Sequence, residues 1–199
     1  MLEAARRKAA SLKLSNTTFQ TSDVTTLPYE AASFDAVTTR FCLMFLPEIP
    51  KAVAEIARIL RPDTWVAAAV WSAPEKNPYL KIPIDVIKQF AEIPPPDPAA
   101  PGIFRLAKPG ELAGMLEQAG LANISEQEFL GDVRFAAADD YFSSLMDIAA
   151  PIQNLWAKLD AAQQTEAKQR IIQTSEQYRK GSAIALPIAV RIVAAQKPG

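Results

Sequence analysis

Few side chains in this sequence could carry out chemistry of their own. The 199 residues contain no histidine and one cysteine, Cys42. Ser-His-Asp catalysis, Cys-His catalysis and histidine-ligated zinc are therefore excluded, an internal disulfide cannot form, and no metal site is expected. Asp139, Asp140 and Tyr141 are the remaining candidates for a general base, but adjacent acids at a helix start usually interact with the helix dipole. No catalytic residue is assigned, and any chemistry must proceed without imidazole.

Composition argues against several classes of partner. The chain is 49% hydrophobic and 22% charged, with a formal net charge of -1. It has no basic excess for a phosphate backbone, so nucleic acid is not an expected partner. No apolar run reaches the roughly 18 residues of a membrane span, and we expect no secretory signal. We therefore expect a cytoplasmic protein with one substantial core or at most two small ones.

Periodicity in the first part of the chain predicts an α/β fold. Residues 1–14 have the pattern of an amphipathic helix, residues 16–20 and 34–41 have the pattern of strands, and apolar residues at helical spacing follow Pro50. Residues 65–71 (WVAAAVW) are almost wholly apolar, which predicts a strand buried on both faces of a parallel sheet. A strand, a helix and a strand joined by short loops form a crossover unit.

Two insertions interrupt this alternation. The first covers residues 73–105 and contains the proline-rich stretch 94–101, a stiff connector that cannot join a central sheet. The second covers residues 138–180 and is predicted to be helical. Sheet elements resume after each insertion, with a strand near a sheet edge over residues 124–129 and a long final strand over residues 183–195.

These patterns divide the chain into a core and a cap. Gly120 ends a predicted helix of the core, and Pro187 within the final strand predicts a bulge or an edge position. The predicted segments are an α/β core (1–72), a cap insertion (73–105), a second piece of the core (106–137), a helical cap insertion (138–180) and the C-terminal core strand (181–199).

Four separated motifs resemble one enzyme family. They are FQTSDVTTLPY at residues 19–29, SFDAV at 33–37, RFCLMF at 40–45 and ILRP at 59–62. In composition and spacing they resemble the class I S-adenosylmethionine-dependent methyltransferases, and within them the small-molecule branch grouped with the ubiquinone and menaquinone C-methyltransferases. The similarity covers nearly the whole chain. It implies a Rossmann-like sheet, S-adenosylmethionine as the cofactor and a small organic methyl acceptor.

The resemblance also implies cofactor-binding residues. Asp23 matches the acid that accepts a hydrogen bond from the adenine amine, and Val24 matches the neighbour whose backbone N–H meets the ring. Arg40 and Phe41 match the end of the strand that lines the pocket beside the methionine portion. Two alternatives stay open: a lone aspartate in such a loop is usually a turn residue, and Arg40 could equally be a surface arginine.

The sequence departs from the family at the start of the cofactor site. The family's glycine-rich turn, and the later acid that binds the ribose hydroxyls, have no counterpart here, since none of the seven glycines forms a G-x-G pattern. We expect a truncated form of the fold that lacks the N-terminal part. Because each charge-assisted hydrogen bond to the ribose contributes about 1.5–3 kcal/mol, weak or absent binding of S-adenosylmethionine is expected.

The missing part has a consequence for assembly. The family's sheet order places the absent strands beside residues 34–41, which leaves this strand with an apolar edge. Either residues 16–20 pair with it directly, or two copies of the chain join there. We expect a homodimer or a larger homo-oligomer.

The insertions fall where the resemblance places a substrate cap, over the carboxyl ends of the strands. Tyr79, Phe104 and Tyr141 are candidate walls for a small, partly apolar acceptor; alternatively, these aromatic side chains form the core of the cap itself. Three functional hypotheses follow. The chain is a methyltransferase for a small organic acceptor, a non-catalytic remnant that acts as a binding or oligomerising module, or one part of a split enzyme.

Overall fold

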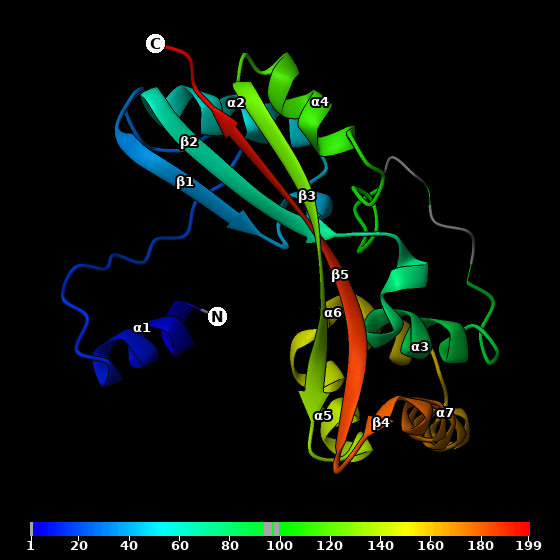
Figure 1. Ribbon diagram of the computed structural model, residues 1–199. Helices are drawn as coiled ribbons and strands as arrows, with labels where there is room; N and C mark the ends of the chain where they lie inside the picture. The colour runs from blue at the N-terminus through cyan, green and yellow to red at the C-terminus, as the bar shows by residue number, and fades with distance from the viewer. Residues whose placement is uncertain (1, 94–96, 98–99) are drawn as a thin grey trace.

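The fold is built on one mixed sheet. A computed structural model describes residues 2–93, 97 and 100–199. The long strands lie in the order β1-β2-β5-β3, and the short β4 pairs with β5 (Figure 1). β1 and β2 are parallel, whereas β5 is antiparallel to both β2 and β3. The strands are β1 (Phe34–Arg40), β2 (Leu60–Trp71), β3 (Ala122–Phe135), β4 (Arg179–Lys180) and β5 (Ala183–Gln196).

The α/β half forms around the connection from β1 through α2 (Ile49–Ile59) to β2. Pro50 lies in the first turn of α2, where a missing N–H costs no helical hydrogen bond. α2 and α4 (Glu111–Gln118) pack on one face of β2, and alternate strand residues enter this first core. The residues that β2 contributes are Leu60, Val66, Ala68 and Val70. The predicted strand–helix–strand unit with parallel strands is confirmed.

The opposite face of this half is open. Trp65 on β2 is 44% exposed, and Ile192, which pairs with Ala69 on the same face, is 42% exposed. The prediction that residues 65–71 are buried on both faces is therefore wrong for the described part of the chain. The reason is that α2 and α4 pack into the same core, on the side of Val66.

A second core lies in the cap. Four helices contribute to it together with the other ends of β3 and β5 (Figure 1). β5 supplies Ile184 and Leu186 to this second core but Val193 and Ala195 to the first. Because the long strands belong to both cores, the division into five segments stays a prediction. The helices are α3 (Pro78–Ile87), α5 (Ala138–Ile148), α6 (Ala150–Trp156) and α7 (Ala161–Ser175).

A proline inside α3 leaves one carbonyl without its helical donor. Pro83 has no N–H, so it cannot donate to the Tyr79 carbonyl four residues earlier. The Tyr141 hydroxyl of α5 donates to this carbonyl instead, over 2.7 Å. Tyr141 is fully buried, so this hydrogen bond joins α3 to α5 inside the second core.

The N-terminal segment differs from its prediction. α1 (Leu2–Ser11) forms as expected and lies away from the sheet (Figure 1). Residues 16–20 form no strand; they are largely exposed, and Arg6 donates to the Phe19 carbonyl over 3.2 Å. The alternative in which they pair with residues 34–41 is therefore wrong. β1 is an edge strand, and its outer edge has no strand partner among the described residues.

Two local predictions about glycine and proline are confirmed. Gly120 follows α4 with a φ of 83°, the left-handed conformation that ends many helices. Pro187 pairs with Asp132 of β3, whereas pairing of β5 with β2 stops at Val190, so Pro187 lies where β5 has a free edge. In the proline-rich stretch, residues 94–96, 98 and 99 lie outside the described residues. No helix in the described ranges combines the length and hydropathy needed to cross a bilayer.

Candidate functional site

The parallel pair β1 and β2 brings two aromatic side chains to one edge of the sheet. Phe41 follows β1, and its ring stacks on that of Trp71 at the end of β2, with a centroid distance of 4.2 Å and an interplanar angle of 11°. The Phe41 N–H donates to the Ala69 carbonyl over 2.8 Å. Phe41 has a φ of 52°, which is uncommon for a bulky residue, and strained backbone conformations of this kind cluster at active sites, ligand clamps and switch regions.

The cap lies directly beside this edge. Trp71 packs against both cores, and its ring lies 6.3 Å from that of Tyr79 on α3. The segment before α4 crosses η1 (Leu43–Phe45), where the Gly102 N–H donates to the Met44 carbonyl over 3.0 Å. Phe104 in that segment is half-buried against the second core. On its cap side, the edge is therefore bordered by the ring of Tyr79.

Asn77 holds the end of β2 in place, and sequence reasoning missed this role. The residue is fully buried, and its Nδ2 donates to the carbonyls of Ser72 (3.1 Å) and Ala73 (3.0 Å). Its Oδ1 accepts the N–H of Ala189 from β5 over 2.9 Å. The signal was an asparagine directly before Pro78 in the segment that leaves a buried strand, where a side-chain amide can satisfy loop backbone.

Asp23 and Val24 lie on the loop that precedes β1. Oδ1 of Asp23 accepts the N–H and the hydroxyl of Thr25, both over 2.8 Å, and these bonds lower the pKa of the Asp23 carboxyl. The turn-residue alternative therefore describes this oxygen. Oδ2 has no hydrogen-bond partner among the described residues, and the residue is exposed. Val24 is half-buried against the first core.

A partly buried charged cluster lies between the two cores. Arg191 of β5 is 7% exposed and donates to Glu126 of β3 over 2.8 Å. Glu128 accepts from Lys76 (2.6 Å) and from Ser72, and these bonds lower the pKa of the Glu128 carboxyl. Arg191 Nε has no partner among the described atoms. The cluster joins β2, β3 and β5 next to the edge that carries Trp71.

The described residues contain no group of three histidine, cysteine, aspartate or glutamate side chains that could hold a metal ion. Burial raises the pKa of both Tyr79 and Tyr141. Neither phenol is therefore suited to act as a general base at neutral pH.

Comparison with known proteins gives the sequence a context. Residues 1–68 match the family model described as a methyltransferase domain. The chain is 29% identical over 143 residues to the ubiquinone/menaquinone biosynthesis C-methyltransferase UbiE of Rhizobium etli, an alignment that covers 67% of this chain and 55% of that protein. It is 30% identical over 142 residues to demethylmenaquinone methyltransferase of Staphylococcus aureus, covering 67% of this chain and 58% of that protein. The sequence of this chain is therefore similar to those of class I S-adenosylmethionine-dependent methyltransferases.

Solved structures with the methyltransferase fold match this chain along its whole length. The YcgJ protein of Bacillus subtilis matches with a TM-score of 0.59 at 18% identity, covering 100% of this chain and 79% of that one. Phosphoethanolamine N-methyltransferase 2 of Haemonchus contortus, solved with phosphomonomethylethanolamine and S-adenosylhomocysteine, matches with a TM-score of 0.54 at 16% identity, covering 100% and 42%. At these identities the likeness shows the fold, which is the predicted Rossmann-like α/β class.

The chain spans little more than half the length of the two curated relatives. Of the residues predicted to bind S-adenosylmethionine, Arg40 and Phe41 lie next to each other at the carboxyl end of β1. Asp23 and Val24 lie on a separate loop, and no hydrogen bond or ring contact joins the two groups within the described residues. Their roles stay predictions.

Proposed function

We propose that this chain takes part in S-adenosylmethionine-dependent methyl transfer to a small organic acceptor, at the carboxyl edge of β1 and β2. The observation that carries the proposal is the stacked pair of Phe41 and Trp71 at this edge, with the strained backbone of Phe41. Open α/β sheets bind ligands outside the carboxyl ends of their strands. The sequence relationship to C-methyltransferases supports methyl transfer as the reaction.

On the donor side, we assign the adenine end to Asp23 and Val24 and the methionine end to Arg40 and Phe41. The unpartnered Oδ2 of Asp23 supports this, because a carboxylate oxygen can accept a hydrogen bond from the adenine amine. Arg40 is exposed and has no ion pair among the described residues, so its guanidinium is available. When bound, the cofactor supplies an electrophilic methyl group. The chain's own residues orient it and exclude water.

On the acceptor side, we assign Phe104 to direct contact with the substrate. Tyr79 and Tyr141 are buried in the second core, so we assign them to supporting this wall from behind. No general base is assigned. An acceptor that is already nucleophilic needs only in-line positioning against the methyl carbon.

We further propose that these 199 residues bind the cofactor weakly. They contain no G-x-G pattern, so contacts to the ribose and the amino-acid end are reduced. The loss of two charge-assisted hydrogen bonds weakens binding at least about a hundredfold, toward submillimolar or millimolar dissociation constants.

Calorimetric titration with S-adenosylhomocysteine tests this function. We expect weak but saturable binding that falls about tenfold or more in Asp23→Ala, because a hydrogen bond to a charged group is lost. Asp147→Ala is the matched control, since Asp147 is an exposed aspartate on α5. No binding at millimolar concentration, or equal losses in both variants, would contradict the proposed site.

The second candidate is a binding or oligomerising module. The observations that favour it are the free outer edge of β1 and the open sheet face around Trp65. An unpaired edge can pair with the same edge of another copy, so we propose a homo-oligomer through the edge of residues 34–41. Light scattering at micromolar concentration tests this, and a monomer mass would contradict it.

A further inference from the structure

One ion pair on α2 holds the loop that carries Asp23. Arg58 donates from Nε and Nη2 to the two carboxylate oxygens of Glu55, over 2.7 and 2.8 Å. The same guanidinium donates to two loop carbonyls, that of Tyr29 over 2.8 Å and that of Leu27 over 3.0 Å. Glu55 in turn accepts the Leu27 N–H over 2.8 Å. Both backbone polar groups of Leu27 are therefore bound by the Glu55–Arg58 pair.

This arrangement depends on the planar guanidinium. Four of its hydrogen bonds point in fixed directions, two toward the carboxylate of Glu55 and two toward the loop. A lysine carries its charge at one point and cannot hold a bidentate contact while also reaching two carbonyls. Arg58 is 36% exposed and Glu55 is 20% exposed, so the pair lies at the protein surface and covers the loop's inner side.

Short-range hydrogen bonds connect Asp23 to this anchor. The Thr26 N–H donates to the Asp23 carbonyl over 3.2 Å, which closes a turn. Thr25 donates twice to the Asp23 carboxylate, each time over 2.8 Å. Residues 23–27 therefore form one locally bonded unit whose last residue is held by the Glu55–Arg58 pair.

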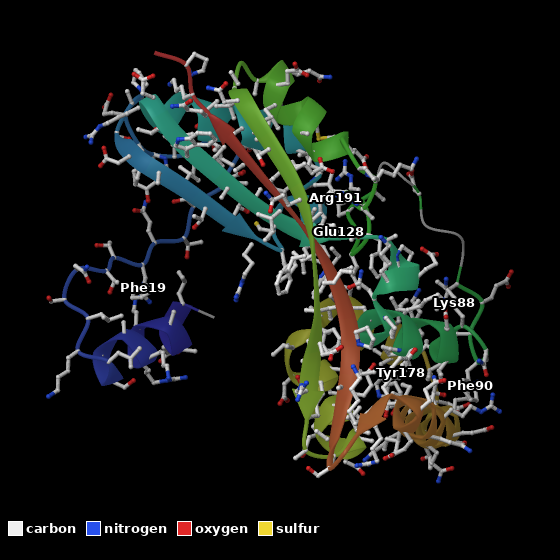
Figure 2. All side chains as sticks on the ribbon, viewed as in Figure 1. Phe19, Lys88, Phe90, Glu128, Tyr178 and Arg191 are labelled. Carbon is white, nitrogen blue, oxygen red and sulfur yellow. The ribbon has the colours of Figure 1, made fainter. Side chains whose placement is uncertain are left out.

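Few other contacts fix this unit. Among the described residues, the hydrogen bonds that connect residues 15–29 to α2 or to later elements all go to Glu55 or Arg58. Val24 adds an apolar contact with the first core. By contrast, Phe19 earlier in the same segment is bonded within the N-terminal segment itself, to Arg6, and lies away from the sheet (Figure 2).

We infer that Glu55 and Arg58 are positioning residues for cofactor binding, which act through Leu27 to set the direction of the Asp23 carboxylate. The inference rests on the role assigned to Asp23 in the proposed function. It goes beyond that function because it gives two residues on α2, which contact the loop and not the adenosyl group, an effect on the affinity for that group. The expected loss on breaking the pair is about tenfold, since one charge-assisted hydrogen bond is misplaced.

The test combines two substitutions with two measurements. Arg58→Lys keeps the charge but removes the fork, and Glu55→Gln keeps the shape but removes the charge. Hydrogen exchange of residues 23–29 reports the order of the loop, and calorimetry with S-adenosylhomocysteine reports affinity. We expect faster exchange confined to this loop and about tenfold weaker binding in both variants. Arg170→Lys on α7, which likewise removes a guanidinium from an exposed pair, that with Glu166, is the matched control and changes neither.

A double variant separates positioning from general destabilisation. If Arg58 acts through Asp23, then Arg58→Lys weakens binding by much less when Asp23 is already alanine, because the misplaced group is absent. Equal losses in both backgrounds, or unchanged exchange and affinity in the single variants, would overturn the inference while leaving the proposed function intact. A wild-type chain that binds no S-adenosylhomocysteine at millimolar concentration would overturn the proposed function, and the positioning role with it.

Discussion

The two ends of β5 show how differently the two halves of the molecule are packed. In the cap half, Ile184 and Leu186 are fully buried among helices. In the α/β half, Val193 is fully buried but the neighbouring Ile192 is 42% exposed. One strand with apolar residues along its whole length therefore has a closed environment at one end and a one-sided environment at the other.

This contrast indicates that the cap core contributes mainly to stability, whereas the α/β half carries the proposed site. The cap core contains the fully buried Tyr141 and the shared hydrogen bond between its helices, so it is expected to be sensitive to small changes. The α/β half carries the carboxyl edge and the open face around Trp65, where side chains can change at lower cost. Substitutions along β5 and its neighbours test this difference directly.

The largest effect is expected between the two halves, at Arg191. Removing one partner of a buried ion pair leaves an uncompensated charge, so Arg191→Ala is expected to lower the free energy of unfolding by about 3–5 kcal/mol. Glu126 loses the donor at 2.8 Å and keeps only the Gly110 N–H at 3.1 Å. Urea denaturation measures the loss.

A double substitution shows whether the charge or the packing matters. Arg191→Met with Glu126→Leu removes both charges and keeps apolar volume, so its cost is expected to be clearly smaller than that of Arg191→Ala. If both variants lose the same free energy, the ion pair is not the reason that the two halves hold together.

The next effect compares identical substitutions at the two ends of β5. Ile184→Ala creates a cavity in the cap core and is expected to cost about 2–5 kcal/mol. Ile192→Ala removes a side chain that is already partly in water and is expected to cost less than about 1 kcal/mol. Equal costs would mean that the open face is covered in solution, for example by a second copy of the chain.

Sequence patterns predicted those helices and strands whose position follows from local chemistry. The crossover from β1 to β2, the end of α4 at Gly120 and the edge position of Pro187 followed from local chemistry. The predicted strand at residues 16–20 failed because a strand needs a neighbour, and no local pattern supplies one. Apolar composition alone also overstated the cover over residues 65–71, since both helices lie on one side of the sheet.

The candidate site was predictable only where motifs mark it. Phe41 was identified from a motif, but its stacking partner Trp71 comes from a distant strand and was assigned only to the sheet. Glu55 and Arg58 are opposite charges at i,i+3, a spacing that is common on helix surfaces. This spacing does not indicate that the two residues bind a loop about 30 residues earlier in the chain. Such contacts depend on tertiary structure and cannot be derived from spacing.

A smaller effect is expected inside the cap from a single hydroxyl. Tyr141→Phe removes the donor to the Tyr79 carbonyl, which Pro83 cannot replace, so a buried acceptor is left unpaired at a cost of about 1–3 kcal/mol. Pro83→Ala restores an N–H at that position in α3. We expect Tyr141→Phe to cost less in the Pro83→Ala background, as measured by thermal or urea unfolding.

That double-mutant cycle has a clear opposite outcome. If Tyr141→Phe costs the same with and without Pro83, the hydroxyl stabilises the cap for a reason other than the missing helical donor. The comparison between the halves then rests on apolar packing alone.

The smallest expected effect is the pH dependence of the Glu55–Arg58 pair in the α/β half. The hydrogen bonds from Arg58 and from the Leu27 N–H lower the pKa of Glu55 from 4.5 to about 2. Because the folded pKa lies below the unfolded value, this carboxylate stabilises the fold above about pH 4.5, and the contribution is lost as the pH falls toward 2. Outside the pair, the carboxylate of Glu30 also acts on the guanidinium of Arg58, more weakly than Glu55 does.

Glu55→Gln should therefore flatten the acid side of the stability curve without changing its shape near neutrality. Urea unfolding of Glu55→Gln and wild type between pH 3 and 7 measures this, because the range includes the unfolded pKa near 4.5. The control is Glu75→Gln, since Glu75 is an exposed glutamate without an ion pair among the described residues. The effect is kept small by the partial exposure of both side chains, since solvent screens surface pairs. If the free energy of unfolding depends on pH in the same way in Glu55→Gln and Glu75→Gln, the loop beside the first core is held by the apolar contacts of Val24 and not by charge. The α/β half then depends less on polar contacts than its geometry indicates.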